Sequence, residues 1–212
     1  PTWQRLDLWL AAQPRALEFE AQLSLIRTIA EALQYAHGKN VVHRGLNPRA
    51  ILVRADRSGR LQARITDWQG VGRTDAATTT ATRGVTTLAI ADPVNQVADD
   101  ERWLKDAFTA PEGVLVGAPD RLRLDVFGLG ALAFFIVTGG RAPARTRADL
   151  SARLRDQGGL DVSVELPQAP SALREAILKA TTPRVSERLP DVGSVLEALD
   201  AAEPAASDEV VD

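Results

Sequence analysis

A short stretch between residues 41 and 53 has the composition of a loop that could carry acid–base or phosphate chemistry. It reads VVHRGLNPRAILV, with His43 and Arg44 ahead of a proline-marked turn and apolar residues on both sides. A histidine exchanges a proton near neutral pH, and an arginine binds a phosphate through two parallel hydrogen bonds. The stretch contains no carboxylate, so it lacks the usual group for orienting or deprotonating a hydroxyl nucleophile.

Hydrophobic periodicity places this stretch between a long helix and a β-hairpin. Apolar residues recur at helical spacing over 17–37, and Gly38 stands where a C-terminal helix cap is expected. After the stretch, residues 51–53 and 61–65 predict two strands joined by a turn at 56–59. Regular structure is therefore expected to hold the stretch at both ends.

The remaining pattern predicts a mainly α-helical protein built around one buried helix. Residues 123–138, RLDVFGLGALAFFIVT, are apolar nearly all round, which is typical of a helix inside a core. Further helices are expected at 4–12, 146–157, 170–181 and 190–202. Residues 68–109 are rich in Thr, Ala and Asp and predict a long surface loop. The prediction is one domain over 1–203, followed by an acidic tail over 204–212.

The composition excludes several classes of protein. The 212 residues include no cysteine and two histidines, so disulfides, thiolate chemistry and a His-rich metal site are excluded. The net charge of −3 gives no general attraction to nucleic acid or to an anionic membrane. No run of 18 apolar residues and no signal peptide is present, so we expect a cytoplasmic protein. Because no methionine occurs anywhere, we expect the chain to be a fragment of a longer protein.

Five short motifs follow one another along the chain. They are HRGLNPRA at 43–50, TDWQ at 66–69, APE at 110–112, DVFGLG at 125–130 and a late arginine, Arg188. Their order resembles the C-terminal lobe of a eukaryotic-like Ser/Thr protein kinase of bacterial type. The corresponding kinase motifs are the catalytic loop H-R-D-L-x-x-x-N, D-F-G, A-P-E, the start of the buried central helix and the arginine that pairs with the A-P-E glutamate. The resemblance covers essentially the whole chain and implies a kinase-like C-lobe, with residues 68–109 as its activation-segment-like loop.

The departures from this family pattern fall on the catalytic groups. The resemblance implies that Gly45 replaces the catalytic aspartate, Asn47 the loop lysine and Ala50 the asparagine that holds the second metal ion. Asp67 keeps the place of the D-F-G aspartate, so it is the one candidate for binding a metal ion or a nucleotide. The sequence contains neither a glycine-rich loop nor a strand lysine, so no cofactor is expected for this chain alone. ATP and Mg²⁺ are expected only if an N-lobe is supplied.

The retained residues are structural. By the resemblance, Asp125 accepts hydrogen bonds from the backbone of the His-Arg turn, and Glu112 pairs with Arg188 to brace the end of the activation segment. A buried aspartate needs such donors, because burial without them is costly. We therefore interpret the sequence as one that keeps the family's structural residues and has lost its catalytic residues.

Alternatives stay open for three residues and for the loop. His43 is either a general base or a ring that packs under the loop and hydrogen-bonds backbone. Asp67 either holds one metal ion or is a turn aspartate bonded to backbone N–H groups. Arg44 either receives a phosphate from a threonine of the long loop or pairs with a carboxylate. The long loop itself is either a docking segment or an insertion.

The predicted function is a catalytically inactive pseudokinase C-lobe that regulates or scaffolds other proteins within a larger bacterial protein. Its expected partner is another protein or an adjoining domain of the same protein, with no membrane and no direct nucleic-acid signal. The alternatives are a nucleotide-binding switch without phosphotransfer and an atypical Ser/Thr kinase that uses Asp67. The degenerate loop is also loosely similar to loops in kinase-like proteins of bacterial phage-defence systems.

Overall fold

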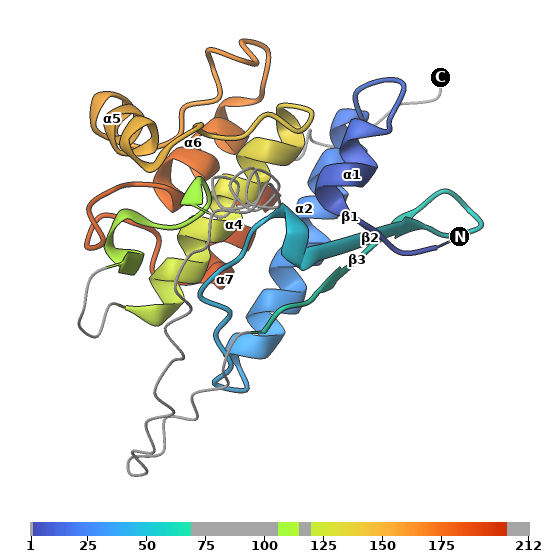
Figure 1. Cartoon of the computed structure of the whole chain (residues 1–212), viewed down its shortest axis with the longest axis horizontal. Helices are drawn as coiled ribbons and strands as arrows, with labels where there is room; N and C mark the ends of the chain where they lie inside the picture. The colour runs from blue at the N-terminus through green and yellow to red at the C-terminus, as the bar shows by residue number, and fades with distance from the viewer. Residues whose placement is uncertain (1, 69–105, 115–119, 203–212) are drawn as a thin grey trace, which may run out of the picture.

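The described part of the chain is mainly helical and carries one small sheet at its edge (Figure 1). The computed structural model describes residues 2–68, 106–114 and 120–202. Its α-helices and strands are β1 (Gln4–Arg5), α1 (Leu6–Ala11), α2 (Phe19–His37), β2 (Ile51–Ala55), β3 (Leu61–Ile65), α4 (Arg121–Val137), α5 (Arg147–Gln157), α6 (Ser171–Ala180) and α7 (Val192–Asp200). Two short 3-10 helices, Pro48–Ala50 and Pro111–Val114, complete the described elements. The prediction of a mainly α-helical fold is confirmed.

The hairpin is present where the alternating pattern predicted it, and a third strand extends it. β2 and β3 pair antiparallel with Leu52 opposite Arg64, and the side chain of Asp56 closes the turn by accepting from the N–H groups of Ser58 (2.8 Å) and Arg60 (3.0 Å). β1 pairs with the other edge of β2, which gives the order β1-β2-β3. The prediction of a two-stranded hairpin alone was therefore incomplete.

The first predicted helix was placed too early. It was expected over 4–12, but Gln4–Arg5 form β1 and the helix covers only Leu6–Ala11. Residues 4 and 5 pair with Val53 and Leu52, and these strand contacts outweigh the local helical pattern. A strand partner almost fifty positions away leaves no signal in local periodicity.

The cap at the end of α2 lies at Gly38, as predicted, but its backbone is not the left-handed one that is usual for a capping glycine. Gly38 is the C-cap residue, but its φ of −63° is ordinary right-handed backbone. The left-handed residue lies two positions later, at Asn40, whose φ is 57°. Asparagine tolerates this conformation better than most non-glycine residues, so it takes the role expected of glycine.

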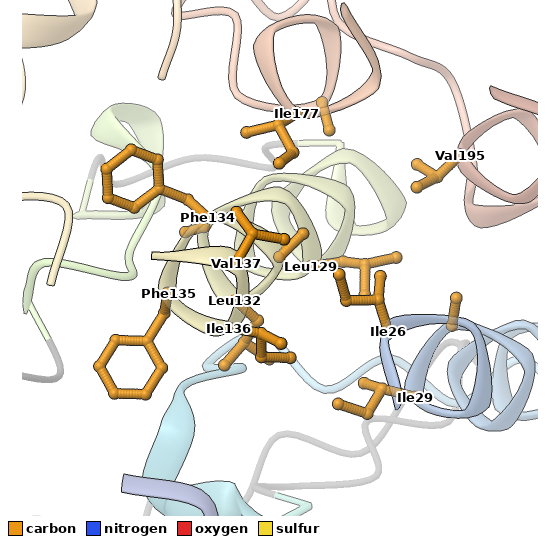
Figure 2. Close-up of a cluster of buried hydrophobic side chains, with 14 of the residues drawn as sticks. Ile26, Ile29, Leu129, Leu132, Phe134, Phe135, Ile136, Val137, Ile177 and Val195 are labelled. Carbon is orange, nitrogen blue, oxygen red and sulfur yellow. The ribbon is translucent and has the colours of Figure 1, made fainter. Parts of the chain in front are cut away.

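Helix α4 forms the centre of the core, as its uniform apolarity predicted. It contacts α2, α6 and α7, and Figure 2 shows side chains from all of these helices packed around it. Every α4 residue from Asp125 to Val137 is buried. Within residues 2–68, 106–114 and 120–202, no helix combines the length and apolarity needed to cross a bilayer.

Two glycines let α4 approach its neighbours closely. A Cβ atom at Gly128 would lie 2.9 Å from the Cβ of Leu46 in the loop that follows α2. A Cβ atom at Gly130 would lie 2.7 Å from both Ala180 Cβ and Thr181 Cγ2 at the end of α6. Both distances are too short for a real side chain, so the small residues set the spacing between α4, the loop and α6.

Replacing Gly130 by alanine is expected to lower the free energy of unfolding by about 1–3 kcal/mol, because overpacking outweighs alanine's better helix propensity. The comparison is Gly45→Ala, since a Cβ atom at Gly45 would meet no heavy atom within 4 Å. Urea unfolding of both variants measures the difference. Equal stability of the two variants would contradict the close packing of α4 on α6.

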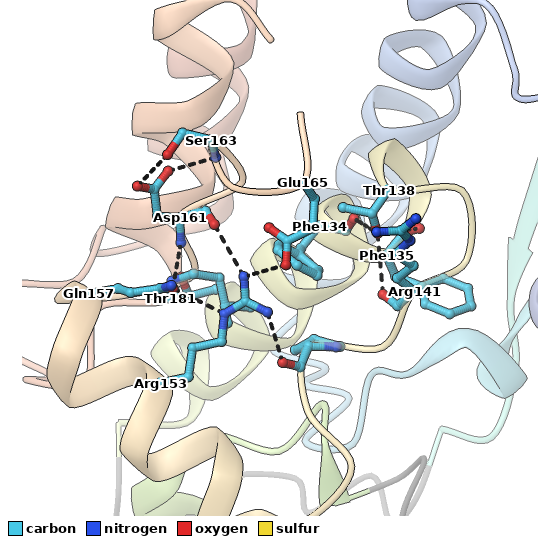
Figure 3. A network of polar contacts seen from close by, with 12 residues as sticks. Phe134, Phe135, Thr138, Arg141, Arg153, Gln157, Asp161, Ser163, Glu165 and Thr181 are labelled. Carbon is cyan, nitrogen blue, oxygen red and sulfur yellow. Dashed lines mark hydrogen bonds and ion pairs between the residues drawn. The ribbon is translucent and has the colours of Figure 1, made fainter. Parts of the chain in front are cut away.

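The connection after α5 is held by one arginine, as Figure 3 shows. The guanidinium of Arg153 donates to Glu165 Oε1 (2.8 Å) and to the carbonyls of Pro143 (3.1 Å) and Asp161 (3.2 Å). It also lies 4.6 Å from the ring centroid of Phe134 on α4. Arg153 thereby ties α5 and the segment before α6 to the core helix.

Candidate functional site

The buried carboxylate of Asp125 anchors the loop that carries His43. Asp125 is 1% exposed, and its two oxygens accept from the N–H groups of His43 (2.7 Å) and Arg44 (2.6 Å). The Nε2 atom of His37, the last residue of α2, lies 2.9 Å from Asp125 Oδ2. One carboxylate therefore joins α4, the loop and α2. The contact with His37 was not predicted, although its position at the end of an expected helix was a usable signal.

The ring of His43 is fully engaged inside the protein. Its Nε2 lies 2.8 Å from the carbonyl oxygen of Thr66, and the N–H of Gly45 donates to its Nδ1 at 3.3 Å. A carbonyl only accepts and an N–H only donates, so the proton must sit on Nε2. The ring also packs edge-on against the ring of Trp68, with 5.0 Å between the two ring centroids. This geometry favours the packing interpretation of His43 over a general base.

Three positions of the loop, 45, 47 and 50, differ in what their side chains can contribute. A Cβ atom at Gly45 would meet no heavy atom within 4 Å, so the backbone can accommodate the first atom of a side chain there. The amide of Asn47 is used within the loop, because it donates to Gly45 O (2.7 Å) and accepts from Arg49 N–H (3.0 Å). Ala50 is completely buried, and its methyl group offers no ligand atom. A clash at the Cβ position therefore does not explain the missing carboxylate at position 45.

Asp67 stands at the end of β3 with its side chain exposed. The preceding residue is fixed, because Thr66 donates to Ala50 O through both its N–H (2.7 Å) and its hydroxyl (3.1 Å). Asp67 itself has a φ of 56°, and across the site Arg44 has a φ of 65°. Among the residues that the structure describes, no N–H group donates to the Asp67 carboxylate. The N–H groups of Gln69 and Gly70, which a turn at Asp67 would use, lie outside the described residues, so the turn interpretation stays a prediction.

The ion pair between Glu112 and Arg188 is formed. Arg188 Nη1 and Nη2 donate to the two carboxylate oxygens at 2.5 and 3.1 Å, and the arginine side chain is completely buried. The same guanidinium donates to the carbonyls of Thr182 (2.9 Å) and Arg123 (2.9 Å) and lies 5.1 Å from the ring of Phe127. The APE segment is therefore fixed to the end of α6 and to α4.

Arg147 makes a second contact with the APE segment that the sequence did not reveal. From the start of α5, its Nη2 donates to the carbonyls of Ala110 (3.1 Å) and Pro111 (3.3 Å). A contact to main-chain carbonyls leaves no motif, because any residue at the accepting positions would serve. Arg147 and Arg188 together hold the APE segment from two sides.

The outer face of the sheet is basic and lies beside this site. Cross-strand neighbours share a face, so Arg5, Leu52 and Arg64 lie together on it. The guanidinium carbons of Arg54 and Arg64 lie 4.5 and 4.4 Å from the ring centroid of Trp3. Burial raises the pKa of Asp7. The hydrogen bonds from Arg5 and from the Leu8 backbone, together with the positive charges of Arg5 and Arg49, outweigh burial, so the pKa lies below its usual value.

To a magnesium-bound nucleotide, the described residues of this site offer one exposed carboxylate, that of Asp67. Magnesium in phosphate-transfer sites is held by carboxylate or amide oxygens together with the phosphates. Asp67 offers one carboxylate, while Ala50 offers no oxygen in its side chain. Within the described ranges, no group of three or more His, Cys, Asp or Glu side chains is arranged to hold a metal ion.

Some predicted features lie outside the described residues. These are Gln69, most of the expected 68–109 loop with its threonines, and the acidic tail over 204–212. The side chain of Arg44 is exposed and pairs with no carboxylate within the described ranges, so both interpretations of Arg44 stay open.

Comparison with known proteins places this arrangement in a family. The family described as protein tyrosine and serine/threonine kinase matches residues 2–199. A probable kinase of Streptomyces coelicolor, PglW, is 33% identical over 217 residues, which cover 96% of this chain and 14% of that protein. The chain therefore belongs to the protein kinase family.

More distant relatives are proteins named as both kinase and endoribonuclease. The serine/threonine-protein kinase/endoribonuclease IRE1b of Arabidopsis thaliana is 30% identical over 148 residues, covering 69% of this chain and 15% of that protein. Its Caenorhabditis elegans counterpart, ire-1, is 25% identical over 120 residues, covering 56% of this chain and 11% of that protein. The chain thus spans between 11% and 15% of the length of these three relatives.

Proposed function

We propose that this chain is a catalytically inactive, pseudokinase-like C-lobe that serves as a regulatory or scaffolding module inside a larger bacterial protein. Its partner would be another protein or an adjoining domain of the same protein, in the cytoplasm. A phage-defence setting is one context for such a module, given the loose similarity of its loop to those of such kinase-like proteins. Phosphotransfer needs a carboxylate beside the acceptor hydroxyl and a metal-binding asparagine, and neither residue type is present at positions 45 and 50.

The observation that carries this proposal is the contrast between the support of the loop and its chemistry. Asp125 holds the backbone of His43 and Arg44 at 2.7 and 2.6 Å, and Arg188 holds Glu112 at 2.5 Å. These contacts keep the loop and the APE segment in place, yet no catalytic side chain projects from the loop. A rigid surface without a reacting group is suited to binding another protein.

The proposal predicts no phosphate transfer. With radiolabelled ATP and Mg²⁺, transfer to casein or to the chain itself is expected to remain at background and to be the same for Asp67→Asn. The reason is that Asp67 alone cannot position both the metal-bound phosphate and the hydroxyl nucleophile. Transfer above background that Asp67→Asn abolishes would show that the chain is an atypical kinase.

A second candidate function is a nucleotide-binding switch without phosphotransfer. It is favoured by Asp67, whose exposed carboxylate is held in left-handed backbone with a φ of 56°. Such conformations cost about 1–3 kcal/mol and gather at functional sites. A thermal-shift titration with ATP, with and without Mg²⁺, separates the two candidates. A magnesium-dependent shift, for this chain or for one extended upstream, supports the switch, whereas no shift in either supports the scaffold.

A further inference from the structure

A cavity of about 710 Å³ lies on the side of the molecule formed by the ends of several helices. It opens between the start of α2, the end of α4, the segment leading into α6 and the end of α7. Its lining residues are Ala16, Leu17, Phe19, Gln22, Val137, Leu166, Gln168, Ala169, Pro170, Ser171, Ala172, Leu173, Ala201 and Ala202. None of them belongs to the His43 loop, the APE segment or the sheet, so the cavity is separate from the site described above.

The walls of the cavity define what it can hold. Most lining side chains are aliphatic, and not one of the lining residues is charged. An ion would lose its hydration there without gaining a partner, so the buried part of a ligand must be neutral. The volume is within the range of about 300–1,000 Å³ that is usual for small-molecule sites. Phosphates and nucleotides are therefore poor ligands for this cavity, and a lipophilic molecule is a good one.

Gln22 provides a polar contact point inside this apolar wall. It is 7% exposed, and no described residue forms a hydrogen bond with its carboxamide. Other glutamines of the chain are bonded: Gln13 donates to Trp9 O at 3.0 Å, and Gln62 accepts from Arg54 at 2.8 Å. The carboxamide reaches the cavity and has no described protein partner there, so a ligand that both donates and accepts a hydrogen bond at Gln22 would be stabilised.

We propose that this cavity binds a neutral lipophilic molecule that carries one carboxamide or similarly bifunctional polar group. The apolar body would lie against Leu17, Phe19 and Leu173, and the polar group would pair with the Gln22 carboxamide. Both α2 and α4 reach the cavity. Asp125 of α4 accepts from the His43 loop, and His37 of α2 contacts the same carboxylate, so a ligand there would rest on the helix that holds the loop and on the helix bonded to it.

Dodecanamide is a suitable probe, since it joins an aliphatic chain to a primary carboxamide. Calorimetric titration of the 212-residue chain, below the aggregation concentration of the probe, is expected to show saturable binding. Dodecylammonium, with the same chain and a cationic head, is expected to bind at least about ten-fold more weakly, because its charge has no partner in the cavity. No binding of dodecanamide, or equal binding of the two probes, would overturn the proposal.

Two kinds of variant locate the probe. Ala172→Trp fills the cavity and is expected to abolish binding, whereas Gln22→Leu is expected to weaken dodecanamide binding by about ten-fold through loss of the hydrogen bonds. Gln62→Leu, on the sheet, is the matched control and is expected to bind as the unaltered chain does. Ala169→Phe replaces Ala172→Trp if the latter does not fold. Binding that survives cavity filling, or that ignores Gln22, would overturn the assignment.

Discussion

Asp125→Ala is expected to lower the free energy of unfolding by about 3–5 kcal/mol, one of the two largest effects predicted for a single side chain. The substitution removes the acceptor for the buried N–H groups of His43 and Arg44 and for Nε2 of His37. Water cannot replace the carboxylate, since position 125 is 1% exposed. The midpoint of urea unfolding, at an unchanged slope, is the measurement that reports the loss.

A graded series makes this prediction testable even if the alanine variant does not fold. Asp125→Asn keeps one acceptor oxygen but turns an NH₂ group toward a donor, so it should be less destabilising than alanine. His37→Leu removes one of the three contacts and should cost least. Asp149→Ala is the control, because Asp149 is exposed on α5. Asp125→Ala with the same unfolding midpoint as Asp149→Ala would show that the carboxylate does not hold the loop.

Local pattern was sufficient to predict most of the helices and the hairpin. Helix α4 was expected over 123–138 and covers Arg121–Val137, because a run of apolar residues has few alternatives to burial. The turn between β2 and β3 was expected at 56–59, where Asp56 closes it through its own side chain. In both cases the deciding interactions lie within the element itself.

What the sequence did not reveal depends on contacts between distant segments. β1 exists because Gln4–Arg5 meet Val53 and Leu52, and a two-residue strand has no periodicity of its own. Arg147 binds main-chain carbonyls, which no side chain at the accepting positions marks. The cavity at Gln22 arises from four segments that each look like ordinary core. Such features arise from packing between distant segments, so local sequence patterns do not predict them.

In the candidate site, too, some features could be predicted from the sequence and others could not. The order of motifs implied the contacts of Asp125 and the pairing of Glu112 with Arg188, and both contacts are present. The turn interpretation of Asp67 stays a prediction, because Gln69 and Gly70, whose N–H groups would be the donors, lie outside the described residues. The motifs identify residues that bind one another. The conformation of an exposed turn residue such as Asp67 depends on the surrounding backbone, which a motif does not specify.

Arg188→Met is expected to lower the free energy of unfolding by about 3–5 kcal/mol, because it leaves the Glu112 carboxylate without its partner. The carbonyls of Thr182 and Arg123 would lose their donor as well. Methionine keeps much of the apolar contact with Phe127, so the loss measures the polar contacts rather than a cavity. Urea unfolding again provides the measurement.

A double-mutant cycle separates the pair from its surroundings. If the two side chains interact directly, Glu112→Leu in the Arg188→Met background should restore part of the stability, because no unpaired charge then remains. Arg184→Met is the matched control: Arg184 pairs with Glu187 at 2.9 Å on the exposed surface, and its loss should leave the unfolding midpoint unchanged. Additive effects of the Glu112 and Arg188 substitutions would mean that the bridge contributes nothing beyond its two separate side chains. The APE segment would then have to be held mainly by Arg147.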